Sequence, residues 1–269
     1  MTDYQYTQDL PFSTPPRRVV SLVPSVTESL FELGMGGRLV GRTRSCVHPA
    51  GQVERVPAVG GTKTPDIGAI CALQPDLIIA NQEENRREDV EALTAAGLTV
   101  WVTFPQSVRQ AFNLLWTIMY AFEQPEHSES VRQIERLADV LELLERDKPC
   151  RVFVPVWNAP LMTFNAGTFA HDLLRVCGGQ NIFGDRDQRY PQVTLGEVEA
   201  GQPDVILLPS EPYAFTEAHI AMFDALDTPA SRERGVRLVD GSLLTWHGTR
   251  IARALLTLPA MLCPSADVG

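Results

Sequence analysis

The feature that most constrains the fold is a segment that the chain uses twice. Gln74–Ile78 (QPDLI) recurs 128 residues later as Gln202–Ile206 (QPDVI), and small and apolar residues upstream of both copies match at the same offset. In each copy an apolar helical pattern precedes the Pro-Asp pair and a β-branched run follows it. The sequence therefore predicts two similar halves, each containing the same helix–strand unit.

Strand and helix patterns alternate through both halves. Ser25 and Glu28 have the spacing of a capping box, which predicts a helix start there. The runs that read as strands are Arg18–Val23, Leu39–Val40, Asp76–Ala80, Thr99–Thr103, Arg151–Val156, Asp204–Leu208 and Arg237–Val239. Strands that alternate with helices predict an α/β fold with parallel sheets.

About forty residues of helical pattern separate the halves. The predicted organisation is a loose arm at 1–16, an α/β lobe at 17–106, a helical spine at 107–148 and a second α/β lobe at 149–269. Two such lobes would form a ligand cleft between the carboxyl ends of their strands. Two ordinary helix–strand units without a shared cleft are the alternative.

Charge and composition limit the classes of partner and the compartment that we expect for the protein. The 23 Lys and Arg residues against 33 Asp and Glu residues leave a net charge of −10, which disfavours nucleic acid and anionic membranes. No apolar run is long enough for a membrane span, and the first twenty residues lack an apolar leader. Five scattered cysteines without a CxxC motif favour reduced thiols. We therefore expect a cytoplasmic protein, or a periplasmic or envelope protein if a signal was removed.

Several segments resemble one known family. They are RVVSLVPSVTESLFELG, QPDLIIANQEEN, FNAGTFAHDLLRVCGGQNIF, YPQVT, QPDVILLPS and TWHGTRI, which span nearly all of residues 17–258. The chain resembles the helical-backbone (class III) substrate-binding proteins of ABC transporters, closest to the vitamin B12 and metal-chelate receptors. The resemblance implies two Rossmann-like lobes joined by a long backbone helix. It also implies a monomer without a built-in cofactor that binds a corrinoid, haem or other metal chelate.

The resemblance also implies binding residues. Phe164, Tyr190 and Trp246 align with aromatic residues that the family presents to its ligand. A place in the core or on the lobe surface is the alternative, equally suited to Phe164 and less suited to Trp246, which lies in a polar Thr-Trp-His-Gly stretch. Thr62 and Asn81 stand where vitamin B12 receptors have tryptophans. The remaining residues that we expect to contact the ligand are Pro24, Ser25, Glu83, Asn85, Trp157 and Arg250.

A short loop carries a possible metal-binding pair. Cys46 and His48 are two residues apart, so that in an extended loop both side chains point to one side. Together with His247 they are the predicted metal ligands, to cobalt, to iron or to a bare ion. A buried cysteine beside a surface histidine is the alternative.

Two glycines bear on transport. Gly68 and Gly196, equivalent in the repeat, align with glutamates that dock relatives to their permease, and Asp66 and Glu197 lie nearby. We therefore expect a non-enzymatic binding protein for a corrinoid or other metal chelate that does not dock a permease in the usual way. A conventional ABC transporter substrate-binding protein for vitamin B12, haem or an iron siderophore is the alternative. An enzyme with Cys46 as nucleophile is disfavoured, because no GxSxG, HExxH or P-loop motif is present.

Overall fold

The computed structural model describes residues 10–144 and 148–262, so residues 1–9 of the expected N-terminal arm lie outside the described residues. The chain forms two compact units. Of the described residues, unit 1 draws on 10–105, 111–132 and 247–249, and unit 2 on 106–110, 133–144, 148–246 and 250–262. The helical stretch predicted as a separate spine is thus shared between the units.

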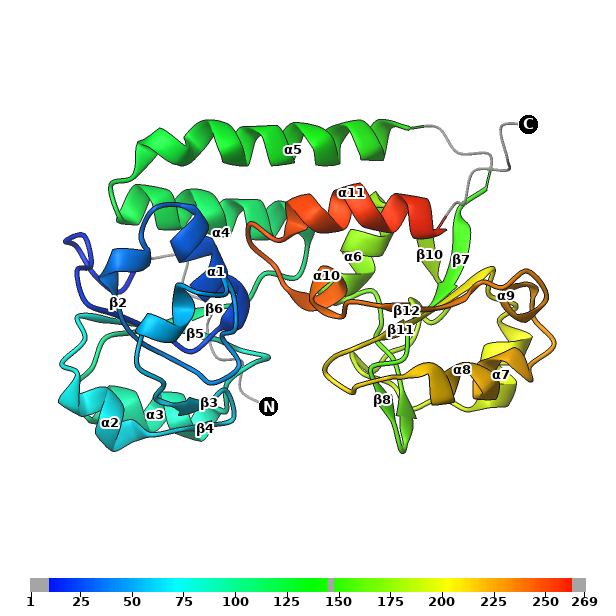
Figure 1. Ribbon diagram of the computed structural model, residues 1–269, viewed down its shortest axis with the longest axis horizontal. Coiled ribbons are helices and arrows are strands. Elements are labelled where there is room, and N and C mark those ends of the chain that lie inside the picture. Colours follow the sequence, from blue (N-terminus) through cyan, green and yellow to red (C-terminus); the bar gives the residue numbers. More distant parts are fainter. Residues whose placement is uncertain (1–9, 145–147, 263–269) are drawn as a thin grey trace. The chain divides into compact units, whose positions relative to one another are not determined.

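Unit 1 is built on a parallel sheet with strand order β2-β1-β5-β6. Figure 1 shows α1 and α4 on one side of these strands and α2 and α3 on the other. A short antiparallel pair, β3 with β4, lies outside the sheet. The elements are β1 (Val19–Ser21), α1 (Pro24–Glu32), β2 (Leu39–Arg42), β3 (Gly60–Gly61), β4 (Thr64–Pro65), α2 (Ile67–Ala72), β5 (Leu77–Asn81), α3 (Arg87–Ala95), β6 (Val100–Thr103) and α4 (Val108–Ala121).

Unit 2 repeats this plan with strand order β10-β7-β11-β12, again parallel. Helices α6 and α11 lie on one side of the strands and α7 and α8 on the other (Figure 1). The elements are α5 (Ser128–Leu143), which begins in unit 1, β7 (Cys150–Phe153), β8 (Trp157–Asn158), β9 (Leu161–Met162), α6 (Phe169–Val176), β10 (Gly179–Asn181), α7 (Leu195–Ala200), β11 (Val205–Pro209), α8 (Glu217–Asp224), α9 (Pro229–Arg232), β12 (Val236–Val239), α10 (Ser242–Thr245) and α11 (Ile251–Leu262).

The repeat seen in the sequence is present in three dimensions. Helix α7 and strand β11 have the bounds of α2 and β5 shifted by 128 residues. Gln74 and Gln202, at the ends of the two helices, both adopt the left-handed backbone conformation, with φ of 47° and 42°. The carboxylate of Asp76 accepts hydrogen bonds from the backbone N–H of Arg17 and Arg18, and Asp204 accepts one from that of Arg151. The Pro-Asp signature therefore ties the start of one strand to its neighbour in each sheet.

Apolar residues on both faces of the strands explain the sheets. In unit 1, Val20, Ile78, Ile70 and Leu93 belong to one buried cluster. In unit 2 the larger cluster includes Phe153, Ile206 and Phe223, with ring centroids of Phe153 and Phe223 5.9 Å apart. Strands covered on both faces read as continuous apolar runs, which is why they stood out in the sequence.

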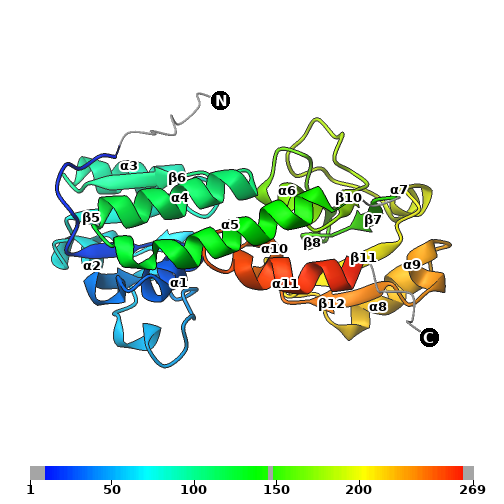
Figure 2. The same ribbon diagram turned by 90° about the horizontal axis from the view of Figure 1, so that it is seen from above.

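One local prediction differs from the structure. Helix α1 begins at Pro24 with Val23 as N-cap, and no side chain caps it, so the predicted Ser25–Glu28 capping box is wrong. Proline suits the first helical position, because its fixed φ is helical and its missing N–H would have no partner there. The forty-residue helical pattern forms two helices, α4 and α5, separated by a short 3-10 turn at Pro125–His127 (Figure 2). Among the described residues, no helix is both long enough and apolar enough to cross a membrane.

Candidate ligand-binding site

The carboxyl ends of the parallel strands carry most of the predicted site residues. In unit 1, Ser25 follows β1, and Asn81 ends β5. In unit 2, Trp157 follows β7, Tyr190 follows β10, and Trp246 follows β12. Ligands of open α/β sheets bind at this edge, so each unit has a candidate binding edge of its own.

The edge of unit 1 is a polar network around the amide of Asn81. Its Oδ1 accepts hydrogen bonds from the backbone N–H of Glu83 at 2.8 Å and of Glu84 at 3.2 Å. Its backbone N–H donates to Oδ1 of Asn85 at 2.8 Å, and the Asn85 amide donates to the carbonyl oxygen of Thr62 at 3.0 Å. These contacts hold the loop after β5 in one conformation.

His247 joins this network from the far end of the chain. Because Oδ1 of Asn81 accepts two backbone bonds, its Nδ2 is the group that faces Nε2 of His247, at 3.4 Å. An amide nitrogen only donates, so Nε2 accepts and Nδ1 carries the proton, directed to Oγ of Ser25 at 3.5 Å. Burial lowers the pKa of His247 to about 4. The ring is therefore neutral near pH 7, with both nitrogens in contact with polar partners.

The Cys46 thiol is fully buried. Its Sγ lies 3.1 Å from Oγ1 of Thr27 and 3.2 Å from Oγ1 of Thr43, and burial raises its pKa. A buried, protonated thiol is a poor metal ligand and a poor nucleophile. His48 is half-buried. Among the described residues no three His, Cys, Asp or Glu side chains gather as a metal-binding group.

The aromatic residues of unit 2 differ in exposure. Phe164 is 2% exposed and lies in the core, which was the alternative to ligand binding at that position. Trp157 is 44% exposed and Tyr190 40% exposed, with the guanidinium of Arg189 5.9 Å from the Tyr190 ring. Two rings of the predicted set are thus presented to solvent at the edge of unit 2.

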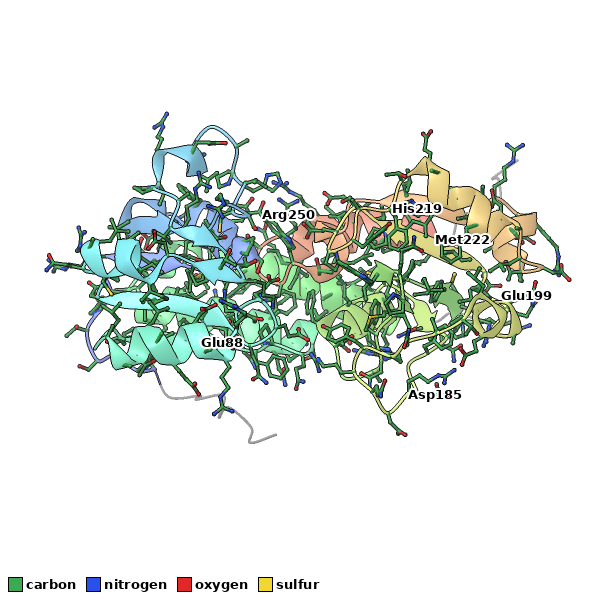
Figure 3. All side chains as sticks on the ribbon, turned by 90° about the horizontal axis from the view of Figure 1, so that it is seen from below. Glu88, Asp185, Glu199, His219, Met222 and Arg250 are labelled. Atoms are coloured by element: carbon green, nitrogen blue, oxygen red, sulfur yellow. The ribbon has the colours of Figure 1, made fainter. Side chains whose placement is uncertain are left out.

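Trp246 and Arg250 form a buried network that the sequence did not reveal. Trp246 is 7% exposed, and its Nε1 donates to Oε1 of Glu211 at 2.5 Å. Arg250, 3% exposed, lies over the Trp246 ring at 4.8 Å and donates to Oγ of Ser242 at 3.0 Å. Burial raises the pKa of Glu211. Arg250 is labelled in Figure 3, and its burial leaves little of the guanidinium for a ligand.

Sequence reasoning missed Tyr213, whose ring contacts that of Trp157, and His219, whose ring contacts that of Tyr213. The one signal by which the sequence could have identified them is their position after the strand Val205–Pro209. His219 lies on α8 beside Met222, as Figure 3 shows.

Comparison with known proteins identifies the class. A family model described as "Periplasmic binding protein" matches residues 19–241, and the chain belongs to this family. The chain is 30% identical over 195 residues to the vitamin B12-binding protein of Yersinia pestis, which covers 71% of this chain and 69% of the relative. It is 27% identical over 208 residues to the vitamin B12-binding protein of Vibrio cholerae serotype O1, which covers 77% of this chain and 74% of the relative.

Solved structures share the fold. The apo form of the periplasmic heme-binding protein RhuT from Roseiflexus sp. RS-1 matches with a TM-score of 0.80 and 24% identity, over 95% of this chain and all of that one. The periplasmic vitamin B12-binding protein BtuF of Vibrio cholerae matches with a TM-score of 0.77 and 24% identity, over 93% of this chain and 98% of the other. The predicted α/β architecture and the predicted family are confirmed.

Two consequences follow from family membership. The chain is a substrate-binding protein and not an enzyme, as predicted. The expected cytoplasmic location is wrong, because the family and these relatives are periplasmic. That expectation rested on the first twenty residues and on the scattered cysteines, and both are weaker evidence than a family match over most of the chain.

Proposed function

We propose that the protein binds a large, flat metal chelate, a cobalamin-like corrinoid or a haem, as a transport-type binding protein. The observation that carries the proposal is the pair of exposed aromatic rings, Trp157 and Tyr190, at the carboxyl edge of the unit 2 sheet. Aromatic faces bind flat ring systems through stacking and burial of apolar area. The names of the vitamin B12-binding and heme-binding relatives support the same ligand class.

The polar edge of unit 1 supplies a different kind of contact. Thr62 and Glu83 are half-buried, and Lys63 donates to the carbonyl oxygen of Glu83 at 2.5 Å. Thr62 and the exposed Lys63 bring polar side chains to this edge, so it offers hydrogen bonds to the polar groups of a chelate. We propose that selectivity among chelates resides here.

His48 is the metal-ligand candidate that we retain. Cys46 is buried against two threonines, and the Nε2 lone pair of His247 is directed at an amide of Asn81. The partly exposed imidazole of His48 has the ligand type that both cobalt and iron accept. We therefore propose that His48 acts as an axial ligand to the metal of the bound chelate.

A visible-absorbance titration tests this proposal. The wild-type protein, His48→Ala and His127→Ala, the same change at another half-buried histidine, are each titrated with aquocobalamin and with hemin. We expect a saturable band shift for at least one chelate, lost in His48→Ala and retained in His127→Ala. Absence of a shift with both chelates, in a protein shown to be folded by circular dichroism, would reject the proposed ligand class.

We further propose that the protein does not engage a permease through repeat-related carboxylates. An added Cβ at Gly196 would meet no atom within 4 Å, and at Gly68 the nearest is Oδ1 of Asp66 at 3.5 Å, so neither position requires glycine for space. The neighbouring acids have local partners. Asp66 caps α2 through the backbone N–H of Ala69 at 2.9 Å, and Glu197 pairs with Arg186 at 2.7 Å.

Binding to a permease–ATPase complex in nanodiscs tests this second step. We expect no saturable binding of the wild-type protein to the complex that serves a vitamin B12-binding relative, with that relative as positive control. The double variant Gly68→Glu/Gly196→Glu should bind more tightly, because it restores a carboxylate in each repeat. Tight, ATP-sensitive binding by the wild-type protein would refute the step and favour conventional transport.

A further inference from the structure

Three aromatic side chains lie in series at the carboxyl edge of the unit 2 sheet, where the Tyr213 ring contacts that of Trp157 on one side and that of His219 on the other. Trp157 lies in β8, Tyr213 in the loop after β11, and His219 in the first turn of α8. The ring centroids of Trp157 and Tyr213 are 5.5 Å apart at 70°, and those of Tyr213 and His219 are 5.6 Å apart at 88°. Tyr213 and His219 are half-buried, whereas Trp157 is 44% exposed.

We propose that this trio is a ligand subsite. The Trp157 face stacks on a flat ring, and the Tyr213 hydroxyl donates a hydrogen bond to an oxygen at the edge of that ring. The inference rests on the proposed function and adds Tyr213 and His219 to Trp157, which the resemblance already indicated.

The tautomer of His219 is determined by its neighbours. The backbone N–H of Thr216 donates to Nδ1 at 3.0 Å, so Nδ1 is unprotonated and the ring proton of the neutral imidazole is on Nε2. Nε2 lies 3.2 Å from the hydroxyl oxygen of Tyr213. The imidazole is therefore the donor in this bond and the phenol oxygen the acceptor.

The Tyr213 hydroxyl accepts a second hydrogen bond. Nδ2 of Asn158 lies 3.4 Å from the same oxygen, and an amide nitrogen only donates. With its oxygen occupied as an acceptor twice, the phenol keeps its own proton to donate. Two donors on one oxygen also polarise the O–H bond, which strengthens it as a donor.

Trp157 contributes a ring face rather than a polar group. Its Nε1 donates to the carbonyl oxygen of Ala159 at 3.1 Å, within the turn between β8 and β9. That bond and the edge contact with Tyr213 restrain the indole while almost half of it remains in solvent. A restrained, exposed indole beside a single hydroxyl donor matches a planar macrocycle with oxygen acceptors on its rim.

Two kinds of chelate carry oxygen atoms that can accept the hydrogen bond from Tyr213, and an experiment can distinguish them. The rim of a porphyrin such as hemin carries carboxylates, and the rim of a corrinoid such as aquocobalamin carries neutral amides. A hydrogen bond to a charged acceptor is the stronger. Loss of the Tyr213 donor should therefore weaken binding of hemin more than binding of aquocobalamin.

The test uses the full chain and the variants Tyr213→Phe, Trp157→Leu and Tyr120→Phe. Tyr120, 85% exposed on α4 of unit 1, is the matched control for removal of a phenol hydroxyl. Each protein is titrated with hemin and with aquocobalamin by absorbance, after circular dichroism and thermal melting establish that it folds. For the chelate that binds, we expect Tyr213→Phe to raise Kd about 3- to 10-fold with an amide acceptor and about 10-fold or more with a carboxylate.

We expect Trp157→Leu to raise Kd by about 10-fold, because the stacking face is lost, and Tyr120→Phe to leave it unchanged. If the wild-type protein binds a chelate and the Tyr213 and Trp157 variants bind it equally well, the subsite is overturned while the proposed function stands. If the wild-type protein binds neither chelate, both are overturned.

Discussion

The buried histidine His247 makes the protein sensitive to mild acid. Burial lowers its folded-state pKa to about 4, from an ordinary value of 6.5. In the unfolded chain His247 is protonated below about pH 6.5, whereas in the folded chain it is protonated only below about pH 4. The free energy of unfolding therefore falls between these two pH values and levels off below pH 4. At 1.36 kcal/mol per pKa unit, the full effect is roughly 3 kcal/mol, of which about 2 kcal/mol is lost by pH 5.

The perturbation is His247→Gln, which removes the titrating group and keeps a polar side chain. Urea unfolding at pH 8, 7 and 5 measures the free energy of unfolding of both proteins. Between pH 7 and pH 5 the wild-type protein should lose about 2 kcal/mol more than the variant. Between pH 8 and pH 7 the two should change almost alike, which is the internal control.

NMR spectroscopy of the imidazole provides the direct readout. The nitrogen shifts of His247 should report a neutral ring with its proton on Nδ1 down to about pH 5, because Nε2 faces the Asn81 amide donor. Titration of His247 near pH 6.5, or equal loss of stability in wild type and variant between pH 7 and pH 5, would refute the reasoning.

Three further outcomes follow from local packing. Gly241→Ala should destabilise the protein by about 1–3 kcal/mol in urea unfolding, because the added Cβ would lie 2.6 Å from the Glu211 carbonyl oxygen. Gly196→Ala is the control and should change stability by less than about 0.5 kcal/mol, because its Cβ would meet no atom within 4 Å. Mass-spectrometric mapping after iodoacetamide treatment should find Cys71 alkylated before Cys46, whose thiol is buried and has a raised pKa; the reverse order would contradict this. Glu211→Gln removes a charge whose burial is unfavourable but keeps an acceptor for the Trp246 indole, so it should raise the free energy of unfolding at pH 7 and much less at pH 4. Urea unfolding measures this, and a lower free energy of unfolding at pH 7 in the variant would contradict the reasoning.

The strands and the repeat were readable from the sequence because their signals are local. β-Branched runs predicted the positions of β1, β5, β6, β7, β11 and β12 to within a few residues. The strand Gly179–Asn181 was missed, since a short run with two polar residues and a glycine has no strand pattern. It forms because it pairs in register with β7, from Gly179 opposite Cys150 to Asn181 opposite Val152.

Only part of the candidate site could be predicted from the sequence. Alignment with a known family pointed to Tyr190, but it pointed equally to Phe164, and the sequence does not distinguish an aromatic ring in solvent from one in the core. It also suggested Arg250 as a ligand contact, although the structure buries that guanidinium against Trp246. Tyr213 and His219 carried no motif, because their relation to Trp157 depends on two loops that meet only in the folded unit.

By itself, the sequence determined the α/β class, the doubled helix–strand unit and the sheet edge at which the candidate binding residues lie, because these depend on periodicity and on which residues follow each strand. Tertiary structure alone decided which of those residues are available. His247 contacts Ser25 across 222 positions and Asn81 across 166, and Cys46 is covered by Thr27. Burial, protonation state and hydrogen-bond direction arise from such distant neighbours, so they exist only once the chain has folded.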